Sequence, residues 1–275
     1  MKVLRDRVAV VTGAGGGVGR ALARNLAGRG CHLALVDIDA QALQDTASAL
    51  AECGVTSSRH LVDVSNREQM AALPGAVAAI HGHINILVNN AGITLQKSFA
   101  THSIADWERM INLNLWGVIY GCINFLDDLR QADEAHIVNV SSMSAFVGFP
   151  TQSSYCATKA AVKGLSESLW AELASEGIAV TSVHPGAIKT EMIQATLKDS
   201  DNLVTAQRNY ELAQRMGVTP EHAAERIVDA ILKGKMRIRI GRDAVLLDLV
   251  KRLLPKAIHR PFVKMYRKQQ GVKSL

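Results

Sequence analysis

The chain has 275 residues, of which 48% are hydrophobic, and carries a formal net charge of +6 at pH 7. That length and apolar content are enough for one large core, which excludes a disordered or low-complexity chain. The four cysteines are dispersed, there is no apolar signal segment at the N-terminus, and no apolar run reaches the about 18 residues of a membrane span. We therefore expect a cytoplasmic protein in a reducing compartment.

The first predicted element is a buried strand over residues 7–12, followed by a glycine-rich turn and a helix over residues 20–30. Gly13 would permit a tight turn, while Gly17 and Gly19 would let the backbone approach a pyrophosphate and let the helix pack on the sheet. A diphosphate would lie on the exposed amides at the helix N-terminus. The sequence therefore predicts a dinucleotide site whose turn comprises Gly13, Gly15, Gly16, Gly17, Val18 and Gly19.

The second predicted strand, over residues 32–37, ends in Asp37. A carboxylate about twenty residues past the glycines can accept hydrogen bonds from both adenosine ribose hydroxyls and would repel a 2′-phosphate. No Arg or Lys lies among the glycines or directly after Asp37, so NAD is favoured over NADP. The alternative is that Asp37 only caps a helix that begins near Ala40.

The rest of the chain continues the alternation of strands and helices. Further strands are predicted over 59–64, 84–89, 136–141, 178–184 and 237–241, and helices over 41–53, 66–81, 103–131, 154–176 and 220–233. This order predicts an α/β fold, a Rossmann-type doubly wound parallel sheet of about seven strands with helices on both faces. Ligands of such sheets bind beyond the carboxyl ends of the strands, and every motif named in this section follows such an end.

Tyr155 and Lys159 lie one turn apart on one face of the helix predicted over 154–176, and Ser142 closes the strand over 136–141. A free tyrosine has a pKa of about 10, and a fixed cation beside it lowers that pKa. This combination is typical of acid–base chemistry at an alcohol oxygen. A tyrosine and lysine at this spacing are common on ordinary helix surfaces, so the neighbouring strand-end motifs are what favour the catalytic interpretation.

Over about residues 5–241 the sequence resembles the short-chain dehydrogenase/reductase family. Residues 12–19 match the family's coenzyme turn, residues 89–92 its Asn-Asn-Ala-Gly motif, and residues 185–190 its Pro-Gly-x-Ile-x-Thr segment. Asn114, Ser142, Tyr155 and Lys159 match the family's four catalytic residues at the usual separations. No motif position departs from the family pattern.

The resemblance implies a role for each of these residues. Tyr155 would transfer a proton to or from the substrate oxygen, Ser142 would hydrogen-bond that oxygen, and Asn114 would hold a proton-relaying water. Lys159 would lower the tyrosine pKa and bind the nicotinamide ribose. The remaining coenzyme contacts would be Asp63 and Val64 at the adenine, Asn90, Ala91 and Gly92 along the adenosine, and Pro185, Gly186, Ile188 and Thr190 at the nicotinamide.

The substrate side is expected to include Thr94, Met143, Phe149 and Met192, with residues 192–214 as a lid. These mostly apolar residues favour a hydrophobic secondary alcohol or its ketone. Two alternatives stay open: a non-catalytic NAD-binding scaffold, and a racemase, epimerase or dehydratase on the same fold. The histidines have no metal-ligand spacing, so no metal is expected.

The positive charge is concentrated at the C-terminus. Residues 233–275 contain 13 Lys and Arg and two acids, whereas the rest of the chain has 18 basic and 23 acidic residues. We treat residues 1–241 as the dinucleotide-binding and catalytic domain and residues 242–275 as a basic amphipathic extension of it, with a helix over 244–254. In this helix Leu246, Leu249, Val250 and Leu253 recur at helical spacing.

Three interpretations of the extension compete. It packs on its own or a neighbouring subunit, which is favoured because the family usually forms homodimers or homotetramers. It lies instead on an anionic membrane surface, which would make the protein peripheral to a membrane. Nucleic-acid binding is least favoured, because no recognised motif accompanies the charge.

Overall fold

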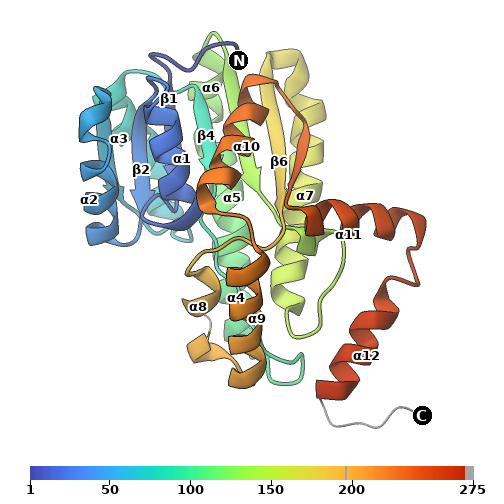
Figure 1. The fold of residues 1–275 in the computed structure, drawn as a ribbon. Helices are drawn as coiled ribbons and strands as arrows, with labels where there is room; N and C mark the ends of the chain where they lie inside the picture. The colour runs from blue at the N-terminus through green and yellow to red at the C-terminus, as the bar shows by residue number, and fades with distance from the viewer. Residues whose placement is uncertain (196, 270–275) are drawn as a thin grey trace.

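The structure is a computed structural model that describes residues 1–195 and 197–269. Its centre is a seven-stranded sheet in the order β3-β2-β1-β4-β5-β6-β7 (Figure 1). All six neighbouring pairs are parallel, so the carboxyl ends of the strands meet at one edge. The predicted doubly wound fold is therefore confirmed. The strands are β1 (Val8–Thr12), β2 (His32–Asp37), β3 (Ser57–Leu61), β4 (Ile86–Asn89), β5 (Ala135–Val140), β6 (Ile178–Pro185) and β7 (Arg237–Ile240).

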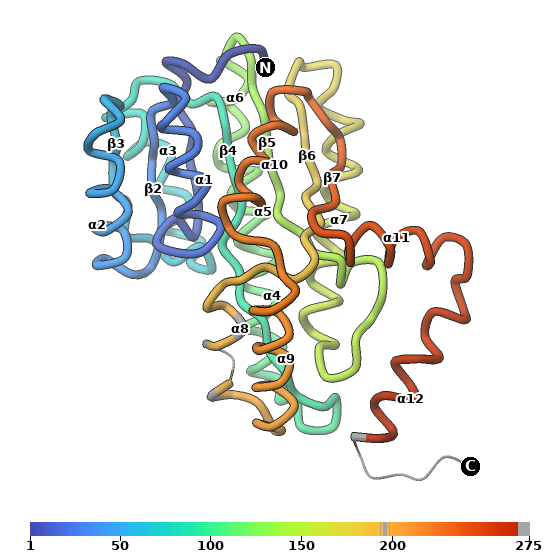
Figure 2. The backbone as a smooth tube through the Cα atoms, in the orientation of Figure 1, coloured from blue at the N-terminus to red at the C-terminus, as the bar shows by residue number. Residues whose placement is uncertain are grey.

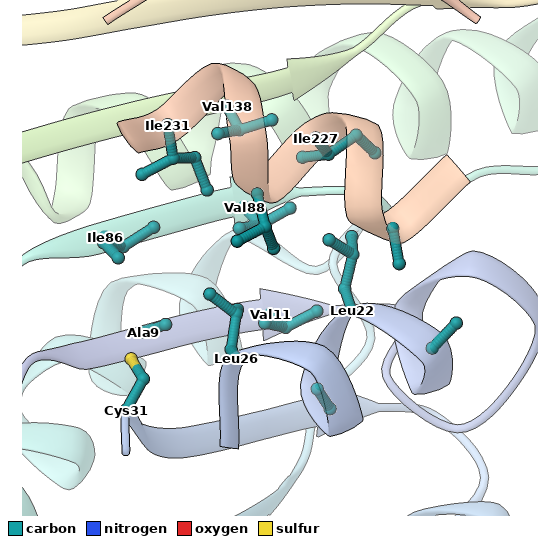
Figure 3. Packing of buried hydrophobic residues seen from close by; sticks show 14 of the residues in the cluster. Ala9, Val11, Leu22, Leu26, Cys31, Ile86, Val88, Val138, Ile227 and Ile231 are labelled. Atoms are coloured by element: carbon teal, nitrogen blue, oxygen red, sulfur yellow. The ribbon is translucent and has the colours of Figure 1, made fainter. Parts of the chain in front are cut away.

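Successive side chains of the central strands enter cores on opposite faces of the sheet. In β1, Ala9 and Val11 belong to one buried cluster and Val10 to the other. Figure 3 shows Val11 in the first cluster with Leu22 and Leu26 of one helix. Burial on both faces explains why these strands read as continuous apolar runs.

Helices cover both faces of the sheet and so make three layers. The first cluster contains side chains of α1 (Gly17–Ala27), α2 (Ala40–Ser48) and α10 (Pro220–Leu232). The second contains side chains of α3 (Arg67–His81), α5 (Gly117–Asn124), α6 (Leu126–Gln131) and α7 (Ser153–Leu173). None of the helices in residues 1–195 and 197–269 is long and apolar enough to span a bilayer.

The remaining helices lie outside these layers. Figure 2 shows α8 (Met192–Ala195) and α9 (Leu203–Met216) below the sheet, near α4 (Ile104–Ile111). The C-terminal helices α11 (Arg242–Leu253) and α12 (His259–Gln269) project sideways from the end of β7. The last predicted residues of the extension, 270–275, lie outside the described residues.

The start of α2 decides between the two interpretations of Asp37. The side chain of Asp39 accepts a hydrogen bond from the Ala42 amide and is the N-cap of this helix. The alternative in which Asp37 caps the helix is therefore wrong, and its carboxylate is free for contacts elsewhere.

Several predicted element boundaries differ from the structure; for example, the helix predicted over 41–53 ends at Ser48. The third strand spans Ser57–Leu61 rather than 59–64, because its pairing with β2 ends at Asp37 opposite Leu61. Asp63 and Val64 therefore lie in the loop beyond the strand. The helix predicted over 103–131 is divided into α4, a π-helical turn (Asn112–Trp116), α5 and α6.

Candidate active site

The glycine turn has the conformation that a dinucleotide requires. Gly13 and Gly17 have φ of +65° and +50°, in the left-handed region. A Cβ on Gly19 would collide with the Gly13 carbonyl group, so only glycine allows α1 to approach the turn this closely. Gly16 is the N-cap of α1 with no side-chain cap, and a Cβ built on it would meet nothing within 4 Å. The open space beside these free helix amides fits a diphosphate group.

Asn90 joins the turn after β1 to the end of β4. Its Nδ2 donates to the carbonyl oxygens of Thr12 at 2.9 Å and Gly13 at 3.3 Å. The amides of Asn90 and Ala91 both donate to Thr12 Oγ1 at 3.0 Å. These contacts lie where the strand order reverses between β1 and β4, the crevice in which such sheets bind ligands.

Asp37 lies at the rim of the glycine turn. Its Oδ2 accepts a hydrogen bond from the Gly15 amide at 2.8 Å, and its Oδ1 accepts one from the Ile38 amide at 2.7 Å. A basic residue that we overlooked in the sequence also contacts this turn. The guanidinium group of Arg20 donates to the Gly15 carbonyl oxygen and, at 3.0 Å, to Thr46 Oγ1. The position of Arg20 directly after Gly19, the last glycine of the turn, is the sequence feature that could have indicated this contact.

Asp63 and Val64 lie in the loop after β3. The Asp63 carboxylate accepts hydrogen bonds from the Ser65 amide at 2.9 Å and the Ser65 hydroxyl at 2.7 Å. Val64 is buried, and a Cβ on Gly117 would lie 3.0 Å from its Cγ2. This loop therefore packs closely on the start of α5.

Asn114 lies in the π-helical turn, a feature that is frequent at functional sites. It is fully buried, and its side chain accepts from the Ile93 amide and donates to the Ile93 carbonyl oxygen, both at 2.9 Å. A Cβ on Gly92 would lie 3.2 Å from Asn114 Oδ1 and 3.4 Å from Lys159 Nζ. The asparagine and the lysine therefore both lie next to Gly92, beside the end of β4.

Ser142, Tyr155 and Lys159 come together at the carboxyl end of β5. Ser142 is the N-cap of a short 3-10 turn (Met143–Ala145), where its side chain accepts from the Ser144 amide at 3.1 Å, and its hydroxyl lies close enough to the Tyr155 phenol to affect the pKa of that group. Lys159 Nζ lies 5.8 Å from the centre of the Tyr155 ring. Ser141 is a structural neighbour, because its hydroxyl donates to the Lys159 carbonyl oxygen at 2.8 Å.

The pKa of Tyr155 shifts in the direction opposite to our expectation. Burial raises the pKa of the phenol, and the nearby Ser142 hydroxyl only partly opposes that effect. Burial also lowers the pKa of Lys159 to about 8. The sequence led us to expect that the lysine lowers the tyrosine pKa; in the structure, burial dominates and favours the neutral form of both groups.

His184 has a place in the site that sequence reasoning missed. Its Nδ1 lies 3.2 Å from the Ser142 carbonyl oxygen, and its Nε2 lies 3.0 Å from Ser182 Oγ. Its ring also packs on Phe146 in a tilted arrangement, with a centroid distance of 4.5 Å. Burial lowers the pKa of His184 to about 4, so the imidazole is neutral at pH 7 and holds the Ser142 backbone.

The segment after β6 lies between the C-terminal helix α11 and the glycine turn. A Cβ on Gly186 would collide with the Asp243 carboxylate, which also accepts a hydrogen bond from the Ala187 amide at 2.8 Å. Pro185 is the last residue of β6, and Ile188 forms a bridge to Val218. A Cβ on Gly17 would lie 3.2 Å from the Thr190 methyl group. The predicted nicotinamide segment therefore reaches the predicted diphosphate turn.

The predicted substrate residues differ in their exposure. Thr94 is buried, and its hydroxyl has no hydrogen-bond partner among the described residues. Met143 and Phe149 are half-buried, and Met192 is exposed at the start of α8. Phe149 packs edge to face on Phe262 of α12, with ring centres 5.1 Å apart. The C-terminal extension thus touches the predicted pocket wall, which we did not anticipate.

The segment expected to form a lid is tied to the loop after β4. Asn209 of α9 donates to Gln96 Oε1 at 3.2 Å. Asp201 accepts from the Ser98 amide at 2.8 Å and from the Thr101 hydroxyl at 2.7 Å. These hydrogen bonds connect both sides of the predicted substrate region.

Comparisons with known proteins agree with this geometry. The model of the family described as short chain dehydrogenase matches residues 7–201. The chain is 36% identical over 264 residues to an oxidoreductase named SadH from Mycobacterium tuberculosis, covering 94% of this chain and 95% of SadH.

Solved structures of similar proteins share the architecture. A short chain dehydrogenase/reductase from Burkholderia phymatum in complex with NAD superposes with a TM-score of 0.86 at 28% identity, covering 94% of this chain and 96% of that one. Levodione reductase superposes with a TM-score of 0.78 at 28% identity, covering 88% of this chain and 98% of that one.

Proposed function

The chain belongs to the short-chain dehydrogenase/reductase family, and from that premise we propose that it transfers a hydride between NAD(H) and a mostly apolar secondary alcohol or its ketone. One observation carries this proposal. Ser142 and Tyr155 are neighbours at the carboxyl edge of the sheet, Lys159 Nζ lies 5.8 Å from the centre of the Tyr155 ring, and Lys159 and Asn114 both lie next to Gly92.

In this proposal the substrate oxygen binds between Ser142 and Tyr155. Because burial raises the pKa of Tyr155, the phenol is protonated at neutral pH and can donate its proton to a carbonyl oxygen. Ser142 hydrogen-bonds the same oxygen and orients the carbonyl group. Lys159, with a pKa of about 8, stays largely protonated at pH 7 and is available to bind the nicotinamide ribose.

The coenzyme supplies the hydride chemistry when it is bound. Its diphosphate would lie on the amides of the glycine turn, where Gly16 leaves open space at the start of α1. Asp37 would accept hydrogen bonds from the adenosine ribose hydroxyls and disfavour a 2′-phosphate, so we propose NAD rather than NADP. The Burkholderia phymatum relative, which was solved with NAD, supports this choice.

The apolar wall supports a hydrophobic substrate. Met143, Phe149 and Met192 offer little to a charged group, and Phe262 extends the same wall. The unpartnered hydroxyl of Thr94 is suited to one additional polar group on such a substrate.

The test removes only the hydroxyl of Tyr155. We expect Tyr155→Phe to bind NADH as the native protein does, measured by fluorescence titration, and to lower kcat/KM for ketone reduction by about 10³-fold. Tyr120→Phe is the matched control, because Tyr120 stacks on Trp116 through its ring and lies outside the site. Near-native turnover by Tyr155→Phe would refute the assigned proton transfer.

A further inference from the structure

Helix α11 exposes its apolar side chains. Leu246, Leu249 and Leu253 recur at intervals of three and four residues and are 63%, 46% and 77% exposed. The opposite side of the helix, with Ala244 and Asp248, is buried. The polar side of α11 therefore packs on its own subunit, whereas the leucine row does not.

Ionic contacts hold α11 in this orientation. The buried Asp248 carboxylate accepts hydrogen bonds from Arg239 Nη1 at 2.8 Å and Arg252 Nε at 3.0 Å, and it lies 3.6 Å from Arg237 Nη2. Arg237 and Arg239 belong to β7, so the cluster attaches the polar side of α11 to the sheet edge. The leucine row is left facing outward as a consequence.

Helix α12 adds exposed cations and apolar groups next to α11. Val263 and Met265 are 49% and 47% exposed. A groove along this helix is lined by Lys256, which precedes the helix, and by His259, Arg260, Val263, Lys264, Arg267 and Lys268. Figures 1 and 2 show both helices projecting from the body of the molecule.

The charge of this surface is not compensated by acids of the same segment. The segment over 233–275 has only two acids, Asp243 and Asp248, against 13 basic residues. Asp248 is surrounded by three arginines, and Asp243 accepts from the amides of Ala187 and Ala244 at 2.8 and 2.9 Å. Among residues 233–269 that the structure describes, the exposed face therefore combines leucines with lysines and arginines of α11 and α12 of which only Arg252 pairs with an acid.

We propose that α11 and α12 form a docking surface for an anionic membrane. Leu246, Leu249 and Leu253 enter the boundary between headgroups and acyl chains, and the lysines and arginines of both helices other than Arg252 pair with lipid phosphates. A second copy of the chain fits this surface poorly, because a two-fold contact would oppose the same basic side chains. Phe262 also contacts Phe149, so the docking surface adjoins the predicted pocket wall.

The test is co-sedimentation of the full chain with vesicles of phosphatidylcholine alone or of phosphatidylcholine mixed with phosphatidylglycerol. We expect the native protein to pellet only with the anionic vesicles. The double variant Leu249→Glu with Leu253→Glu should lower the partition coefficient of the protein onto these vesicles about tenfold. At about 1 M salt, where the screening length falls to ~3 Å, pelleting should be lost as well.

The matched control is Val3→Glu with Ile80→Glu, which changes two side chains on other elements with 57% and 55% exposure. It should pellet as the native protein does. Three results would overturn the proposal. The native protein could stay in the supernatant with anionic vesicles, the leucine variant could pellet as much as the native protein, or the control variant could lose as much vesicle binding as the leucine variant. A leucine variant that pellets normally but has a lower mass by analytical ultracentrifugation would identify the face as an interface between copies of the chain.

Discussion

The ammonium nitrogen of Lys159 donates a hydrogen bond of 2.9 Å to the carbonyl oxygen of Val140, the last residue of β5. This contact holds the lysine inside the protein, where it is 4% exposed. The charge is thereby kept next to the Tyr155 ring, although burial disfavours it and lowers the pKa of the lysine to about 8.

Replacing this lysine should stabilise the protein while inactivating it. The folded-state pKa of about 8 is below the ordinary 10.5, so at pH 7 the folded chain carries a charge that burial disfavours. We expect Lys159→Met to raise the free energy of unfolding at pH 7 by about 2 kcal/mol and to abolish turnover.

The pH dependence gives this prediction a second readout. Between pH 8 and 10.5 Lys159 is protonated to a greater extent in the unfolded chain than in the folded one, so the free energy of unfolding of the native protein rises with pH. The difference in this free energy between Lys159→Met and the native protein therefore becomes smaller. Urea denaturation at pH 7 and pH 10 measures this difference. Lys163→Met is the control, because Lys163 pairs with Glu167 at the helix surface. A lower melting temperature of Lys159→Met at pH 7 would contradict the prediction.

Two neighbouring glycines should respond very differently to alanine. Gly19→Ala would drive a methyl group into the Gly13 carbonyl, whereas Gly16→Ala would place one in open space with extended backbone at φ −158°. We expect a loss of about 3 kcal/mol for Gly19→Ala and less than about 1 kcal/mol for Gly16→Ala, measured by denaturant unfolding. Similar losses for both variants would mean that backbone entropy, and not the close contact, makes the turn glycine-rich.

Coenzyme preference should depend on the carboxylate at the rim of the glycine turn. Asp37→Ala with Ile38→Arg removes the repulsion of a 2′-phosphate and supplies a cation for it. We expect the ratio of kcat/KM for NADP(H) over NAD(H) to rise by about 10²-fold, with Ile38→Arg alone as the control. A native protein that already prefers NADP(H) would show that Asp37 does not determine coenzyme preference. Arg20 would then be the candidate for binding the 2′-phosphate.

Protonation of His184 should destabilise the protein in acid. The folded-state pKa of His184, about 4, is below the ordinary 6.5. The stabilising contribution of the neutral imidazole to the free energy of unfolding is therefore complete above pH 6.5 and is lost as pH falls towards 4. We expect His184→Gln to reduce the loss of stability between pH 7 and pH 5 by about 1–2 kcal/mol, measured as urea midpoints, and His222→Gln, at an exposed position, to leave it unchanged. An unchanged acid slope in His184→Gln would contradict the assignment.

Local pattern alone was sufficient to predict the parallel sheet, the glycine turn after β1 and the shared helix face of Tyr155 and Lys159. These features depend on residues within a few positions of one another, whose backbone preferences and periodicity are visible in the sequence. The strand-end rule then predicted that the motifs would lie at one edge, because parallel strands bring their carboxyl ends together.

The tertiary structure alone decided the direction of the Tyr155 pKa shift, the contact of His184 with Ser142, the packing of Phe262 on Phe149 and the outward orientation of the leucine row in α11. Burial, and contacts between residues dozens of positions apart, determine each of these features. Amphipathic spacing in residues 244–254 predicted a helix with one apolar face, but Asp248 and its three arginines determined which way that face points.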